Sequence, residues 1–107
     1  MTAVGALTEK QWQAQVVELA EHAGWTVHHT FDSRRSRAGW PDLTLLRAPH
    51  LVFVELKTET GRVSRHQQDT LTLLRACGQE AHVWRPSDLD EVLTRLGYRV
   101  ASRARTS

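Results

Sequence analysis

The hydrophobic positions near the start of the chain recur at the period of an α-helix. They are Trp12, Val16, Leu19, Ala20 and Ala23. Spacings of three and four residues place these side chains on one face and predict a helix over residues 9–23. Thr8 and Gln11 have the spacing of a capping box at its start, and Gly24 is a typical helix stop.

The pattern then changes to short apolar runs of the kind that form β-strands. Residues 25–31 are β-prone, and residues 43–47 and 51–56 are rich in Leu and Val. The last two runs are separated only by residues 48–50, Ala-Pro-His. Two apolar runs joined by so short a link predict a β-hairpin.

The position of the turn decides which residues of this hairpin face one another. A turn centred between residues 48 and 49 predicts the pairs Arg47–His50, Leu46–Leu51, Leu45–Val52, Thr44–Phe53, Leu43–Val54 and Asp42–Glu55. Opposite residues have Cβ atoms about 4.5–5.5 Å apart. Side chains alternate along a strand, so Glu55 and Lys57 share one face. We therefore expect Asp42, Glu55 and Lys57 together at the open end of the hairpin, provided that no bulge shifts the register.

The second half of the chain predicts a helix over residues 65–77 with Ser64 as N-cap, a strand over 80–85, and a helix over 88–96 with Ser87 as N-cap. The element order is then helix, three strands, helix, strand, helix. Because the later strand returns through a helical crossover, it should lie parallel to the second hairpin strand. This order predicts an α/β fold with a mixed sheet flanked by helices.

Composition sets the limits for this fold. A chain of 107 residues predicts a single domain over residues 1–107, with a core at about 8–96 and a flexible basic tail at 98–107. A net charge of +2 and a pI near 9.2 favour an anionic partner. No apolar run predicts a membrane span and no N-terminal pattern predicts a signal peptide. The single cysteine, Cys77, excludes an internal disulfide and is compatible with a cytoplasmic location in a bacterial or phage-infected cell. We expect Cys77 to be a small packed residue.

Two kinds of cofactor chemistry find no support in the sequence. No Gly-rich phosphate loop is present, which argues against a nucleotide cofactor. The six histidines lack Cys partners and the close spacing of zinc ligands. By contrast, the two hairpin acids, Asp42 and Glu55, suit a hard cation, Mg²⁺ or Mn²⁺. Lys57 beside them could stabilise an anionic transition state or activate water. The simpler alternative is a surface ion pair between Glu55 and Lys57.

The ordered motifs resemble the VRR-Nuc domain, in its stand-alone virus-type form, within the PD-(D/E)XK nuclease superfamily. The core of the resemblance is Gly-x-Pro-Asp at 39–42, followed by Glu-Leu-Lys at 55–57. Supporting residues are Glu9, Ser33 to Ser36, Phe53 to Arg62, Gln67, Leu74 to Gly78 and Val83 to Pro86. The resemblance covers about residues 8–96 and implies a restriction-endonuclease-like fold.

The resemblance also implies roles for individual residues. Glu9, Asp42 and Glu55 would bind the metal together with the carbonyl of Leu56, and Gln67 would lie beside Lys57. On its helix, Glu9 falls at the centre of the apolar stripe, so we expect it on the buried face. The alternatives are that Glu9 only caps the helix dipole and that Gln67 is an ordinary exposed helix residue.

Basic residues gather at two places near the expected site. Arg34, Arg35 and Arg37 precede the Gly-x-Pro-Asp motif, and Arg62, Arg65 and His66 lie around the start of the second helix. Either group could contact DNA phosphates, although a solvated loop is the alternative for the first.

Together these features predict a Mg²⁺- or Mn²⁺-dependent DNA endonuclease, selective for structures such as four-way junctions or flaps. A homodimer would suit a four-way junction, which needs two symmetric cuts. A catalytically silent nucleic-acid-binding module of the same fold is the alternative.

Overall fold

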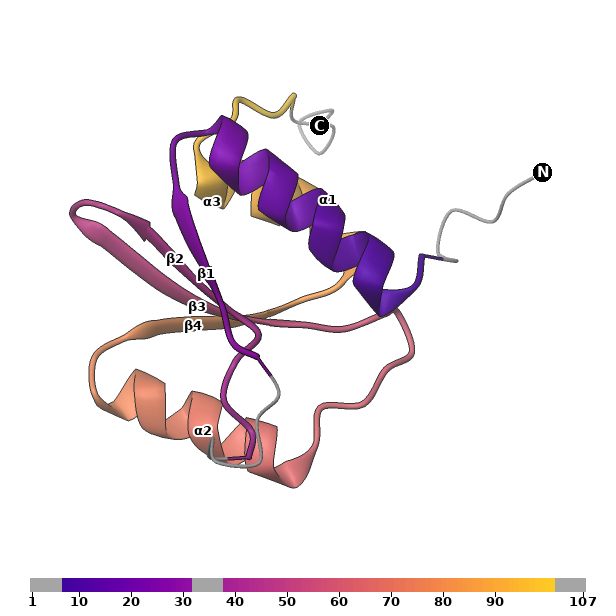
Figure 1. Ribbon diagram of the computed structural model, residues 1–107, viewed down its shortest axis with the longest axis vertical. Coiled ribbons are helices and arrows are strands. Elements are labelled where there is room, and N and C mark those ends of the chain that lie inside the picture. Colours follow the sequence, from indigo (N-terminus) through magenta and orange to yellow (C-terminus); the bar gives the residue numbers. More distant parts are fainter. Residues whose placement is uncertain (1–6, 32–37, 102–107) are drawn as a thin grey trace, which may run out of the picture.

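The computed structural model describes residues 7–31 and 38–101 as four strands, three α-helices and one 3₁₀ turn (Figure 1). In chain order these are α1 (Glu9–His22), β1 (Thr26–His29), β2 (Leu43–Arg47), β3 (His50–Leu56), α2 (Arg65–Ala76), β4 (Glu80–Trp84), η1 (Pro86–Asp88) and α3 (Leu89–Leu96). The predicted order of helix, three strands, helix, strand, helix is confirmed. Among the described residues, no helix combines the length and apolarity that crossing a membrane requires.

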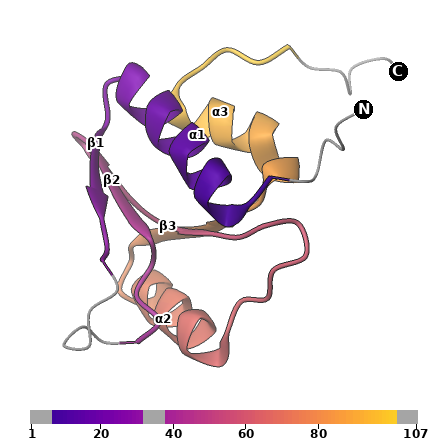
Figure 2. The ribbon, with the colours of Figure 1, turned by 45° about the vertical axis from the view of Figure 1, so that its right-hand side comes forward.

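The strands form one mixed sheet in the order β1-β2-β3-β4. Neighbouring strands are antiparallel from β1 to β3, whereas β4 runs parallel to β3 after the α2 crossover. Helices α1 and α3 cover one face of the sheet and α2 covers the other (Figures 1 and 2). The hairpin pairs Arg47 with His50 and Leu43 with Val54, as its turn predicts.

Each face of the sheet carries its own hydrophobic cluster. The larger cluster joins α1 and α3 to the sheet and includes Trp12, Val54, Leu56 and Trp84, all fully buried. The smaller cluster lies under α2. The Trp12 indole N–H donates to the carbonyl of Trp84 at 2.9 Å, so even the polar atom of this large side chain is satisfied in the core.

The helix starts follow the sequence signals in two of three cases. Thr8 begins α1 and Ser64 begins α2, each through a complete capping box. The prediction for α3 is wrong, since Ser87 lies inside η1 and Asp88 is the N-cap residue. The Asp88 carboxylate accepts the backbone N–H of Arg85 at 2.8 Å, which closes a 3₁₀ turn at Pro86 before the α-helix begins.

Two further expectations about the second half need correction. Cys77 is exposed, because it caps the end of α2 beyond the last turn that faces the sheet. Tyr98 does not belong to a free tail, since its hydroxyl donates to the carbonyl of Leu19 at 2.7 Å and its ring packs against the core. Residues 102–107, the end of that tail, lie outside the described residues.

Candidate active site

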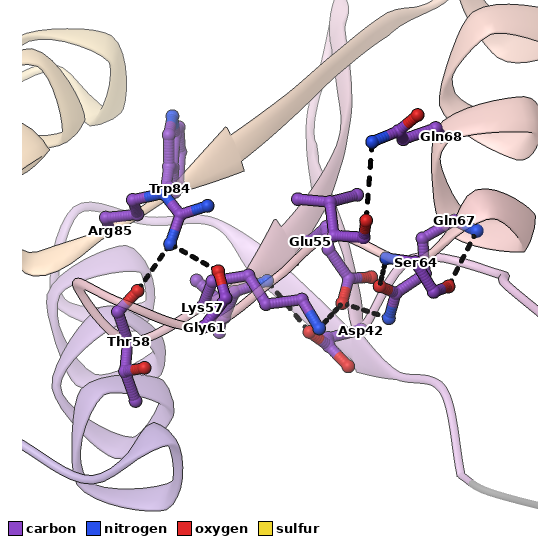
Figure 3. Close-up of polar contacts among 12 residues, drawn as sticks. Asp42, Glu55, Lys57, Thr58, Gly61, Ser64, Gln67, Gln68, Trp84 and Arg85 are labelled. Carbon is purple, nitrogen blue, oxygen red and sulfur yellow. Dashed lines mark hydrogen bonds and ion pairs between the residues drawn. The ribbon is translucent and has the colours of Figure 1, made fainter.

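Asp42, Glu55 and Lys57 meet at the open end of the β2–β3 hairpin (Figure 3). Asp42 immediately precedes β2, Glu55 is the second-last residue of β3, and Lys57 directly follows β3. The Lys57 ammonium lies 3.6 Å from Oε2 of Glu55. The side chain of Glu55 is 2% exposed and that of Lys57 is 13% exposed, so this is not a surface ion pair.

The Asp42 carboxylate is held by the strand that carries Glu55. The backbone N–H of Leu56 donates to Oδ2 of Asp42 at 2.8 Å, while the Asp42 carbonyl accepts from Thr30 beyond the end of β1 at 2.8 Å. Asp42 is therefore tied to both neighbouring strands. This arrangement leaves its carboxylate beside Glu55, as the hairpin register predicts.

Gln67 contacts Glu55 from α2, whereas Asp42 and Lys57 come from the β2–β3 hairpin. Its side-chain N–H donates to Oε2 of Glu55 at 2.7 Å, and its Oε1 accepts the backbone N–H of Ser64 at 2.8 Å. The capping box of α2 thus fixes which end of the amide faces the acid. Gln67 was expected beside Lys57; its direct partner in the structure is Glu55, and Glu55 in turn contacts Lys57.

Burial raises the pKa of Glu55 from 4.5 to about 8. Loss of solvation is the largest cause, and the negative charges of Asp42 and Glu9 act in the same direction. The positive charge of Lys57 opposes these effects without cancelling them. A buried carboxyl beside a second acid therefore keeps its proton at neutral pH unless a further cation joins the site.

One oxygen of Glu55 is left without a partner. Oε1 is buried and accepts no hydrogen bond from any described residue. An unsatisfied buried acceptor costs about 1–3 kcal/mol, and more when it is charged. A hard cation held between Glu55 and Asp42 would occupy this oxygen and offset the repulsion of the two acids, so the donor set fits Mg²⁺ or Mn²⁺.

Glu9 and Leu56 were also expected to contribute to the metal site. Glu9 is exposed, so its prediction on the buried face is wrong: it lies in the first turn of α1, and the buried stripe begins only at Trp12. The negative charge of Glu9 still contributes to the raised pKa of Glu55. Within residues 7–31 and 38–101, no three His, Cys, Asp or Glu side chains converge as a metal site. Asp42 and Glu55 are therefore the two acidic side chains that the structure brings together at the hairpin end, and Leu56 lies between Glu55 and Lys57 in the chain.

Gly39 brings the Pro-Asp segment close to α2. Its φ is +92°, and a Cβ placed there would lie 2.5 Å from the carbonyl oxygen of His66. Only glycine fits both the backbone conformation and the contact. The contact packs the chain just before Asp42 against the start of the helix that carries Gln67.

The expected DNA-contacting residues separate into two groups. Arg62, Arg65 and His66 are exposed around the start of α2, and Arg65 lies 3.6 Å from Asp69 in an exposed ion pair. Arg34, Arg35 and Arg37 lie outside the described residues.

One site-adjacent residue has a contact that the sequence did not predict. Arg85 follows β4 and directs one guanidinium nitrogen, Nη1, at backbone carbonyls of the loop after Lys57 (Figure 3). Its place in the Val-Trp-Arg-Pro motif marked it as part of the family resemblance but indicated no role. The only signal in the sequence was a charged residue at the end of a strand predicted to lie beside the strand that carries Glu55.

Comparison with known proteins identifies the family to which this fold belongs. The family model of the VRR-NUC domain matches residues 1–88. A solved "VRR_NUC domain" is 28% identical, with a TM-score of 0.69, over 84% of this chain and 97% of its own length. A "VRR_NUC domain protein" shares the fold at 22% identity and a TM-score of 0.65, over 86% of this chain and 92% of its own. The search of curated proteins found no match. The chain belongs to the VRR-NUC domain family, a nuclease-type family.

Proposed function

We propose that this chain is a DNA endonuclease that hydrolyses phosphodiester bonds with Mg²⁺ or Mn²⁺. The observation that carries the proposal is the environment of Glu55. This buried carboxyl has one oxygen held by Gln67 and Lys57 and the other without a partner among the described residues. A purely structural acid would be expected to have both oxygens satisfied.

Asp42 and Glu55 would hold the cation, with the Leu56 carbonyl as a further donor and Glu9 adding negative potential from the start of α1. When bound, such a cation neutralises charge on a phosphate and lowers the pKa of a nearby water. Lys57 would orient the attacking water and stabilise the charge that develops on the phosphoryl oxygens. Gln67 would keep Oε2 of Glu55 in place, so that Oε1 faces the cation.

Structure-selective cleavage is the finer part of the proposal, with four-way junctions or flaps as substrates. The exposed Arg62, Arg65 and His66 would contact backbone phosphates, which position DNA without reading its sequence. Paired cuts in a four-way junction would require two copies of the chain. Light scattering of the protein alone and bound to a junction would test that stoichiometry.

A catalytically silent DNA-binding module is the second candidate. It is favoured by the lack, among residues 7–31 and 38–101, of three metal-ligating side chains in one cluster. Such a module would bind DNA through the same basic residues and would need no divalent cation.

A cleavage assay separates the two candidates. Labelled four-way junction, flap and duplex DNA are incubated with Mg²⁺, Mn²⁺ or EDTA, using the wild type, Lys57→Ala and Lys10→Ala. The last variant removes the other lysine of the chain, which is exposed on α1. We expect metal-dependent cutting by the wild type and Lys10→Ala, and its loss in Lys57→Ala. A wild type that binds all three DNAs but cuts none with either metal would favour the silent module.

A further inference from the structure

We infer that Arg85 is a positioning residue for Lys57, acting through the loop of residues 58–63 that connects β3 to α2. This inference rests on the proposed function, because it assigns Arg85 a part in the same reaction. The Nη1 atom of Arg85 donates to the carbonyls of Thr58 at 2.6 Å and Gly61 at 2.7 Å (Figure 3). It also donates to the carbonyl of Glu59 at 3.3 Å. A single guanidinium nitrogen thus draws together the carbonyls of the loop that begins directly after Lys57.

The same loop also contacts η1, the 3₁₀ turn that directly follows Arg85. The Glu59 carboxylate accepts the backbone N–H of Ser87 in η1 at 2.5 Å. The backbone N–H of Lys57 itself donates to the carbonyl of Trp84 at 3.1 Å. The segment from Trp84 to Ser87 therefore contacts Lys57 and both ends of the turn that follows it. No other described segment supplies this set of contacts to the loop.

The loop in turn touches the side chain of Lys57. At Gly61, a Cβ would lie 3.6 Å from Cδ of Lys57 and 3.0 Å from Oγ1 of Thr58. Gly61 thus packs over the aliphatic stem of the lysine, whose ammonium lies 3.6 Å from Glu55. Moving the loop would release this stem, and displacements of about 1 Å at a reacting group can lower a rate by about 100-fold.

Arg47 offers a matched control at the opposite end of the sheet. Its Nη1 also donates to backbone carbonyls, those of Ala23 at 2.8 Å and Leu96 at 3.3 Å. Arg47→Met and Arg85→Met each remove one guanidinium that ties loops together, and both side chains are partly buried. Arg47→Met also removes a guanidinium 5.0 Å from the centre of the Trp25 ring, so it should lose at least as much stability as Arg85→Met. Of the two arginines, only Arg85 lies next to the loop after Lys57.

The test measures single-turnover cleavage and DNA affinity for the wild type and both variants, on the DNA that the wild type cuts, with Mg²⁺. We expect Arg85→Met to lower the cleavage rate constant by about 10- to 100-fold with DNA affinity within about twofold. Arg47→Met should keep the wild-type rate, and Arg85→Lys, which retains donors for carbonyls, should recover part of the loss.

Other outcomes would overturn the inference. An Arg85→Met rate equal to that of Arg47→Met would show that Arg85 is only structural, and a loss confined to DNA affinity would make it a phosphate contact. If Arg85→Met does not fold, Gly61→Ala decides in its place: its Cβ would lie 3.0 Å from Oγ1 of Thr58 and 3.6 Å from Cδ of Lys57, and an unchanged rate would refute positioning by this loop. A wild type without activity would refute the proposed function itself, which is a separate result.

Discussion

Replacing Glu55 by Gln should change how the stability of the metal-free protein depends on pH. Gln is close in shape to a protonated Glu, and its carbonyl oxygen can still accept the 2.7 Å hydrogen bond from Gln67. Its amide can face Asp42. The substitution therefore keeps the packing of the site and removes only the group that titrates.

The size and sign of the effect follow from the pKa of Glu55. The pKa is raised from 4.5 to about 8, mainly by burial and then by the charge of Asp42. Between these values the native state keeps a proton that the unfolded chain releases, so the free energy of unfolding falls as pH rises from about 4.5 to 8. At about 1.4 kcal/mol per pKa unit, the loss is on the order of 3–5 kcal/mol. That is a large part of the stability of a small domain.

Urea unfolding followed by tryptophan fluorescence, in EDTA at pH 5, 6.5 and 8.5, measures this loss. We expect the wild type to lose stability across the series and Glu55→Gln to lose much less. Millimolar Mg²⁺ should restore wild-type stability most strongly at pH 8.5, where the acid is ionised and can bind it.

Glu91→Gln, which neutralises an exposed acid on α3, serves as the control and should follow the wild type. Parallel pH dependences for the wild type and Glu55→Gln would refute the reasoning. They would mean that the site is hydrated or charge-balanced in solution in a way that removes the cost of burying this carboxyl.

Two further predictions concern other parts of the fold. The pKa of Glu80 is lowered to about 2, chiefly by its hydrogen bonds with Arg95. Its contribution to the free energy of unfolding is therefore present above pH 4.5 and is lost as pH falls towards 2. Because the side chain is a third exposed, Glu80→Gln should cost only about 1 kcal/mol at pH 7 and nothing near pH 2, and urea unfolding at both pH values measures this difference. Gly39→Ala should destabilise the protein and lower cleavage, since it adds a clash with the carbonyl of His66 to the strain of a positive φ, which costs about 1–3 kcal/mol. Gly78→Ala isolates the strain, because its φ is +82° and a Cβ there meets nothing within 4 Å; equal losses in thermal unfolding and cleavage for the two variants would contradict the close-approach argument.

The sequence alone determined the parts of this protein that depend on neighbouring residues. The turn at residues 48–49 sets the hairpin register, which pairs Leu43 with Val54. Asp42 and Glu55 are the next residues along the two strands, and their side chains interact. Capping boxes at Thr8 and Ser64 begin two helices where the pattern predicts. These features rest on backbone geometry over a few residues, so a linear pattern contains enough information to predict them.

Only the tertiary structure decided how distant segments meet at the site. The pairing of Gln67 with Glu55 and the contact of Arg85 with the loop after Lys57 join residues 12 or more positions apart, through α2 packing and the parallel β3–β4 ladder. The exposure of Glu9 likewise depends on which turns of α1 pack into the core, since its buried residues begin at Trp12. Hydrophobic periodicity predicts which face of an element is buried, whereas the relative placement of elements, and with it the partner of each polar group, is set by how their side chains pack.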